Sequence, residues 1–194
     1  MIQVRALTGD ALEAALDDVA RLRITVFRDW PYLYDGDHAY ERAYLQAYRD
    51  SDRAILVGAF DGDDLVGAST GAPLSEHADD FAAAFEGQLY DLNRVFYCAE
   101  SVLLPQYRGQ GIGHQFFDMR EAHARSLDFT HSAFCSVVRP DNHPDRPVQY
   151  RPLDAFWHAR GYAPLDGAMA QFSWKDLGDE GETLKPLQFW IRAL

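Results

Sequence analysis

Cysteine, basic side chains and long apolar runs are all scarce in this sequence. Only Cys98 and Cys135 are cysteines among 194 residues, and both lie in apolar, strand-like stretches. Isolated thiols in such surroundings are typical of reduced core residues, so the sequence predicts a fold without a disulfide. No apolar stretch approaches the roughly 20 residues of a membrane-spanning helix, and the N-terminal segment lacks the apolar run of a secretion signal. We therefore expect a cytoplasmic protein with no membrane partner.

The shortage of positive charge bears on the kind of partner. Lysine and arginine together number 18 against 30 aspartate and glutamate side chains, which gives a net charge of -12 at pH 7. Binding along a phosphate backbone depends on clustered cations, so we expect no nucleic-acid partner. The acidic excess would suit a cationic amine substrate, but it is also typical of a surface that only keeps a protein soluble.

Apolar and aromatic residues, in contrast, are abundant. Hydrophobic residues make up 47% of the chain and aromatic residues 13%. A chain of this size and composition can bury one sizeable core. No internal repeat and no linker rich in proline, glycine or serine interrupts it, so we interpret residues 1–194 as a single domain.

Hydrophobic periodicity predicts strands and helices in an alternating order. The predicted strands cover residues 2–7, 54–60, 65–74, 95–104, 131–138, 170–174 and 187–192. The predicted helices cover residues 11–26, capped by Asp10, and residues 38–50, 75–87, 112–127 and 153–160. This order is typical of an α/β fold with a sheet of mixed direction. The aromatic segment 187–194 is expected to form a sheet edge through which a homodimer could assemble.

The segment Arg108-Gly-Gln-Gly-Ile-Gly113 lies where a predicted strand gives way to a helix. Free backbone N–H groups and the positive end of a helix make such a turn a site for an anion. It lacks the lysine and the hydroxyl of a Walker phosphate loop, and His114 stands where a dinucleotide loop needs its third glycine. A diphosphate held without magnesium, as in coenzyme A, fits the segment best; the alternative is that the glycines serve only a tight turn.

Two motifs resemble those of a known family. Arg108-x-x-Gly111-x-Gly113, between a strand with Pro105 and an amphipathic helix, is similar to the acyl-CoA signature of the GCN5-related N-acetyltransferase (GNAT) family. The segment Phe156-Trp-His-Ala-Arg-Gly-Tyr162 resembles the end of that family's last helix, and the element order resembles its whole fold. The resemblance implies a GNAT fold, with a mixed, mostly antiparallel central sheet of about seven strands flanked by helices. The predicted helix 75–87 and a proline-rich loop after residue 138 depart from the minimal pattern.

The resemblance also implies how acetyl-CoA binds as co-substrate. The backbone amides of the glycine-rich turn would hold the diphosphate, a strand before it would pair with the pantetheine arm, and the loop after residue 138 would contact the cofactor. The residues concerned are Arg108, Gly109, Gln110, Gly111, Ile112, Gly113 and His114 for the diphosphate, Val102, Leu103 and Leu104 for the arm, and Asn142 in the loop. The seven histidines show no metal-ligand spacing, so we expect no metal.

Catalysis on an amine needs a base, because neutralising an alkylammonium at pH 7 costs about 4.6 kcal/mol. Glu100 is the only charge within the apolar strand before the glycine turn, and burial would raise its pKa toward a useful range. The alternative is a structural ion pair with Arg94 or with a loop arginine. Family members commonly use a tyrosine of the last helix to protonate the thiolate, but this sequence has Trp157 there, so Tyr150 is our substitute candidate.

The sequence therefore predicts an acetyl-CoA-dependent N-acetyltransferase that moves an acetyl group to a primary amine of a small molecule or peptide by direct attack on the thioester. A non-catalytic acyl-CoA sensor or interaction module of the same fold is the alternative, because the usual tyrosine is missing. Transfer to an oxygen, or from a longer acyl donor, is a third and more distant interpretation. The acceptor itself is not identified by the sequence, since variable segments build its pocket.

Overall fold

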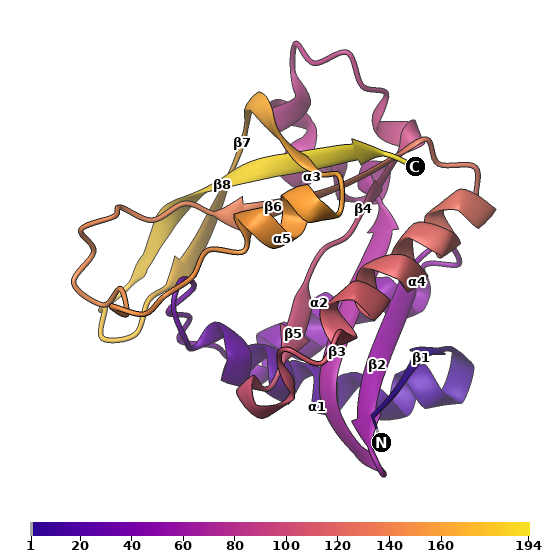
Figure 1. Ribbon diagram of the computed structural model, residues 1–194, viewed down its shortest axis with the longest axis horizontal. Coiled ribbons are helices and arrows are strands. Elements are labelled where there is room, and N and C mark those ends of the chain that lie inside the picture. Colours follow the sequence, from indigo (N-terminus) through magenta and orange to yellow (C-terminus); the bar gives the residue numbers. More distant parts are fainter. Residues whose placement is uncertain (1) are drawn as a thin grey trace.

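The computed structural model describes residues 2–194, in which one mixed sheet is covered by helices on both faces (Figure 1). The helices are α1 (Gly9–Phe27), α2 (His38–Asp50), α3 (Ala78–Phe81), α4 (Ile112–Ser126) and α5 (Asp154–Ala159). The strands are β1 (Gln3–Leu7), β2 (Ile55–Asp61), β3 (Asp64–Pro73), β4 (Val95–Tyr97), β5 (Ser101–Leu103), β6 (His131–Val137), β7 (Ala163–Lys175) and β8 (Glu182–Ala193). None of the described helices combines the length and the apolar character that a bilayer crossing requires.

The strand order is β1-β2-β3-β4-β6-β8-β7, and β5 pairs with β3 beyond β4. Every pairing is antiparallel except that of β4 with β6. Helices α1 and α2 lie behind the sheet in Figure 1, whereas α4 and α5 lie in front of it. The predicted mixed, mostly antiparallel sheet of about seven strands flanked by helices is confirmed.

The helices are held to the sheet by apolar stripes at helical spacing. In α1, Leu12, Leu16 and Val19 are buried against β2 and β3. In α4, Ile112 and Phe116 are buried on the opposite face of the same strands. The sheet thus separates two apolar layers, and a residue on a central strand faces either α1 and α2 or α4 and α5.

The predicted strand 95–104 is interrupted by a β-bulge, which divides it into β4 and β5. Ala99 and Glu100 both oppose Thr70 of β3: Ala99 N donates to Thr70 O at 3.1 Å, and Thr70 N donates to Glu100 O at 3.1 Å. A bulge increases the local twist and redirects the strand. As a result β4 runs beside β6, but β5 pairs only with β3.

Three other predictions about the elements are wrong in detail. Helix α1 begins at Gly9 after Thr8, so Asp10 is inside the helix and is not its cap. The segment 75–87 is not one helix but two 3₁₀ turns around the single turn of α3. The predicted edge strand 187–194 belongs to β8, which pairs with both β6 and β7 and is therefore internal. Its consecutive residues Phe189 and Trp190 are both buried, as expected when both faces of a strand are covered.

Candidate active site

The glycine-rich turn before α4 has the geometry of an anion cradle. Gly109 and Gly111 have φ angles of +76° and +79°, in the left-handed region that favours glycine. Within the described chain, the N–H groups of residues 109–113 donate no hydrogen bond, whereas Arg108 N donates to Pro105 O and His114 N to Gly111 O. Of the seven amides predicted to hold a diphosphate, the five from Gly109 to Gly113 are therefore available at the positive end of α4.

Next to the cradle, β5 and the second half of β6 diverge. Leu104 N donates to Val66 O at 3.1 Å, and Val102 lies opposite Ala68, so the main-chain groups of these two residues face β3. In an antiparallel pair, successive residues turn their main-chain groups alternately toward and away from the partner strand. The main-chain groups of Ser101 and Leu103 therefore point away from β3. There Arg108 Nε donates to Leu103 O at 3.1 Å. Beyond Ala133, β6 pairs only with β8, so β5 and this part of β6 each have one edge that pairs with no other strand of residues 2–194.

The bulge is held from the α4 side by Arg120, a residue that the sequence reasoning missed. Its side chain is buried, and Nη1 donates to Thr70 O at 3.1 Å and to Glu100 O at 2.9 Å, while Nη2 donates to Ser101 Oγ at 2.9 Å. Both carbonyls also accept a main-chain hydrogen bond within the bulge, so Arg120 adds a second, charged donor to each of them. A signal was present: Arg120 follows Phe116 by one helical turn and thus lies on the apolar face of α4.

On the opposite face, Glu100 belongs to a buried ionic triad. Arg23 of α1 hydrogen-bonds Glu41 of α2 through Nε and places Nη1 2.8 Å from Glu100 Oε1. The second contact is an ion pair without hydrogen-bond alignment. Tyr44 donates its hydroxyl proton to Glu100 Oε2 at 3.1 Å. The partner predicted for a structural ion pair, Arg94 or a loop arginine, is wrong; the partner is Arg23.

The charges within this triad are not balanced. Glu41, Arg23 and Glu100 are all buried, and two carboxylates share one guanidinium. The cluster carries a net negative charge in a region where charge is costly. The triad therefore holds one carboxylate more than it has cations.

Tyr32, in the segment between α1 and α2, is a second residue that the sequence reasoning missed. Its ring lies 4.5 Å from that of Phe27 and 5.8 Å from that of Trp174, and its carbonyl accepts hydrogen bonds from Arg139 Nη2 and Trp174 Nε1. Burial raises the pKa of the phenol, and Cys135, Arg23 and Glu100 are close enough to influence it. The Tyr32 phenol therefore stays protonated at neutral pH.

The structure places the other predicted residues less centrally. Tyr150 is half-buried at 6.0 Å from Trp30, and desolvation raises its pKa. Asn142 is exposed, and its side chain makes no hydrogen bond to residues 2–194. Trp157, at the position of the usual tyrosine, packs 5.0 Å from Phe134 and 5.1 Å from Trp190, inside an aromatic cluster.

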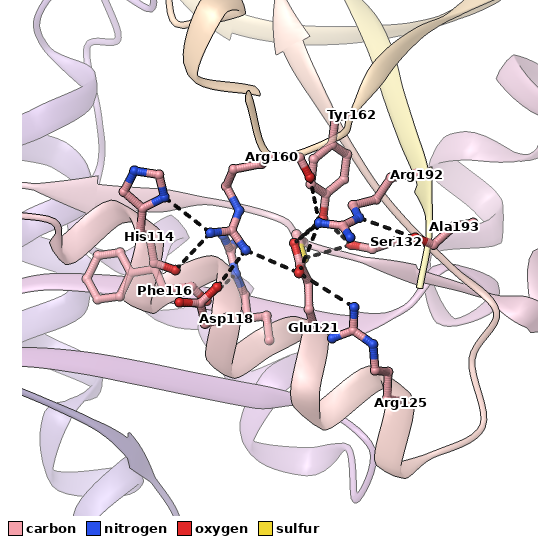
Figure 2. A network of polar contacts seen from close by, with 12 residues as sticks. His114, Phe116, Asp118, Glu121, Arg125, Ser132, Arg160, Tyr162, Arg192 and Ala193 are labelled. Atoms are coloured by element: carbon pink, nitrogen blue, oxygen red, sulfur yellow. Dashed lines mark hydrogen bonds and ion pairs between the residues drawn. The ribbon is translucent and has the colours of Figure 1, made fainter. Parts of the chain in front are cut away.

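A polar network fixes the start of α4 relative to α5 (Figure 2). Glu121 of α4 is buried, accepts a hydrogen bond from the Tyr162 hydroxyl at 3.1 Å and lies 3.2 Å from Arg160 Nη2. Arg160 also pairs with Asp118 at 2.7 Å and contacts the carbonyl of His114 at 3.4 Å. Figure 2 shows these arginine contacts along one face of α4. The first turn of α4, and with it the anion cradle, is thereby tied to the end of α5.

The two cysteines are free and buried, as predicted. Burial raises the pKa of Cys135 to about 12, and its sulfur lies 3.5 Å from the Tyr97 hydroxyl. The pKa of Cys98 is raised by the same cause. A search of residues 2–194 found no group of three histidine, cysteine, aspartate or glutamate side chains arranged to hold a metal ion.

Comparisons with known proteins agree with this geometry. A model of the Acetyltransferase (GNAT) family matches residues 19–149. No curated protein matches the sequence. Ribosomal-protein-alanine N-acetyltransferase from Brucella melitensis is similar in structure, with a TM-score of 0.62, 14% identity and 99% of each chain covered.

Two further solved structures are similar over nearly their whole length. An acetyltransferase from Thermus thermophilus has a TM-score of 0.58 and 16% identity, with 100% of this chain and 97% of that chain covered. YncA from Salmonella typhimurium, solved with its cofactor acetyl-CoA, has a TM-score of 0.62 and 12% identity, with 100% and 94% covered. The matched region includes α2, the bulge and the anion cradle, and the chain belongs to the GNAT family of acetyltransferases.

Proposed function

We propose that this enzyme transfers the acetyl group of acetyl-CoA to a primary amine of a small molecule or peptide, and that the amine attacks the thioester directly. The observation that carries the proposal is the position of Glu100. It lies in a buried triad with a net negative charge, only two residues before Val102 and on the strand that leads into the anion cradle. The proposed proton acceptor and the residues proposed to bind acetyl-CoA thus lie on one short segment of the chain.

The donor would be held mainly by main-chain groups. Five N–H groups from Gly109 to Gly113 fit a diphosphate, and the acetyl-CoA named in the Salmonella structure supports this assignment. The outward main chain of Ser101 and Leu103 would pair with the pantetheine arm, whereas that of Val102 and Leu104 is turned to β3. Contact of Asn142 with the cofactor stays a prediction.

Glu100 would act as the base that removes the proton of the amine. Making an alkylamine neutral at pH 7 costs about 4.6 kcal/mol, so a nearby acceptor is needed. Protonation of Glu100 neutralises the buried triad, while Arg23 stays paired with Glu41. This is the physical reason for preferring a base over a purely structural ion pair.

The leaving thiolate would be protonated by a phenol. Tyr32 is our first candidate, because its hydroxyl is influenced by both Glu100 and Cys135, which lie on the two diverging strands. Tyr150, the candidate from the sequence, influences the same phenol and stays the second. Arg139 and Trp174 would serve by holding the main chain of Tyr32 in place.

Direct transfer is favoured over a covalent acyl-enzyme. An acyl-enzyme through Cys135 would need a thiolate, and burial raises the pKa of this thiol to about 12. The thiol of Cys98 is disfavoured for the same reason. The amine is therefore the nucleophile that meets the thioester.

The proposal is tested by release of free coenzyme A thiol with saturating acetyl-CoA across a panel of small amines and N-terminal peptides. We expect thiol release that depends on an amine, and Glu100→Gln to lower kcat on the order of 10²-fold or more while acetyl-CoA still binds. Binding of acetyl-CoA without release for any amine would instead support the sensor. The cytoplasmic location, the single domain and the absence of a nucleic-acid partner stay predictions.

A further inference from the structure

Glu100 is connected to the C-terminal half of helix α2 by a chain of hydroxyl groups. The Tyr44 hydroxyl donates to Glu100 Oε2 at 3.1 Å, and the Tyr44 and Tyr48 hydroxyl oxygens are 2.9 Å apart. The two tyrosines are four residues apart on α2, so their side chains lie on the same face. Three oxygen atoms in hydrogen-bonding contact thus lead away from the buried carboxylate.

Tyr48, the last residue of this chain, also lines a pocket separate from the anion cradle. This pocket has a volume of about 480 Å³, and its lining includes Tyr48, Asp50, Asp52, Arg53, Glu76 and His77. The side chains of Asp50, Asp52, Arg53 and Glu76 are exposed, so the pocket reaches the solvent. Tyr48 itself is buried and lies between this pocket and Tyr44.

His77 is a half-buried residue that lines the pocket. Its ring is 5.8 Å from that of Tyr48 and 5.5 Å from that of Tyr97. Burial lowers the pKa of the imidazole, against the opposing influence of Asp80, Glu100 and Glu76. The imidazole is therefore mainly neutral at pH 7 and can take up a proton.

We propose that Tyr44 and Tyr48 relay the proton taken up by Glu100 through the sheet-facing side of α2 to the pocket that contains His77. The relay rests on the proposed function, because it needs Glu100 as the base. Each acetylation of an ammonium substrate releases one proton, which Glu100 must pass on before the next turnover. Release through α2 would return this base to its ionised form.

The step conserves protons and needs no other reactant. With both phenol O–H bonds turned outward, the O–H bond of Glu100 breaks as a new one forms on Tyr44. The proton of Tyr44 passes to Tyr48, and that of Tyr48 passes to water in the pocket that Tyr48 lines. Burial raises the pKa of both phenols, so a free phenolate is avoided and the transfers are concerted.

The relay is tested with Tyr44→Phe and Tyr48→Phe, which keep each ring and remove only the hydroxyl group. Tyr40→Phe is the matched control, because Tyr40 lies on the same helix, is exposed and has no hydrogen bond through its hydroxyl to residues 2–194. We expect both relay variants to lower kcat by about 10-fold or more, with KM unchanged for both substrates and an altered solvent isotope effect on kcat. Imidazole buffer should restore kcat of Tyr48→Phe in a concentration-dependent manner and leave Tyr40→Phe unaffected.

The relay would be overturned if Tyr44→Phe and Tyr48→Phe kept the parent kcat, or lost it without buffer rescue and without a change in the isotope effect. That result would leave the proposed function intact as long as Glu100→Gln is inactive. If Glu100→Gln kept full activity, the base assignment itself would fail, and the relay with it. Thermal unfolding of each variant shows that a loss of kcat does not reflect loss of the fold.

Discussion

Arg120 of α4 donates a hydrogen bond to the main-chain carbonyl of Glu100 across 2.9 Å, whereas the side chain of Glu100 points to α1 and α2 on the other face. One residue is therefore held from both sides of the sheet. Its main chain is fixed by α4, and its carboxylate is fixed by Arg23 and Tyr44. The position of the proposed base depends on contacts that are distant in the sequence.

Replacing Arg120 should destabilise the fold strongly. Arg120→Met removes charge-assisted hydrogen bonds to the buried carbonyls of Thr70 and Glu100, and we expect the free energy of unfolding to fall by about 3 kcal/mol. Urea denaturation measures the change. Arg125→Met is the control on the same helix, because Arg125 is exposed and makes only a 3.9 Å ion pair, so its effect should stay within about 0.5 kcal/mol. Equal effects of the two variants would show that the hydrogen bonds of Arg120 to the bulge do not stabilise the fold.

Gly111→Glu should abolish binding of acetyl-CoA. A carboxylate about 4 Å from the diphosphate would cost about 4 kcal/mol, and we expect the Kd from calorimetry to rise about 100-fold or more. Gly62→Glu is the matched control, because Gly62 also has a positive φ, of +62°, but lies in the β2–β3 hairpin. Both variants suffer backbone strain, and only the first should lose affinity. A Kd equal to that of the parent for Gly111→Glu would show that the anion cradle does not bind acetyl-CoA.

The two tyrosine candidates can be separated by single substitutions. Tyr32→Phe removes the phenol that lies near Glu100 and Cys135, and we expect kcat to fall by about 10-fold or more, with little change in the KM for acetyl-CoA. Tyr150 lies against Trp30, in a more peripheral position. If Tyr32 is the proton donor, Tyr150→Phe should keep kcat within about a factor of three of the parent. The reverse pattern in steady-state kinetics would assign the role to Tyr150.

The buried imidazole of His77 should make stability depend on pH. Its pKa is lowered in the folded state, so the unfolded chain binds more protons below the ordinary value of 6.5. The free energy of unfolding contributed by neutral His77 is therefore present above that value and is lost as the pH falls from 7 to 5. His77→Gln should lose less stability over this interval than the parent in urea denaturation at both pH values. An equal loss in both proteins would show that other groups account for the dependence.

The local features of this fold could be predicted from the sequence, because each depends on residues that are close together along the chain. The limits of α2 and the hairpin at residues 61–64 agree with the structure, since a cap and an Asp-Gly turn mark them. The cradle was predicted on the same basis, although the structure shows that two of its seven amides are already used within the chain.

The triad could not be predicted, because it joins α1, α2 and the bulge. Arg23 and Glu41 are 18 residues apart, and both lie far in sequence from Glu100, so no spacing rule links them. Position in the sheet was misjudged for β8 for a related reason. The aromatic segment 187–194 was predicted to form an exposed sheet edge. Its consecutive apolar residues are instead buried on both faces of the sheet, because β8 lies between β6 and β7.

The extra residue in the bulge also sets the phase of the side chains along this strand. Tyr97 and Glu100 are three residues apart, yet both face the side of α1 to α3, whereas Cys98 and Ser101 face α4. In an uninterrupted strand, residues three apart point to opposite faces. Without the bulge, the alternation that runs from Tyr97 would turn the carboxylate of Glu100 toward α4, whereas deleting Ala99 would remove the bulge and leave Glu100 on its present face. The bulge thus lets the chain carry one more residue between Tyr97 and Ser101 while Glu100 stays on the face of Arg23 and Tyr44.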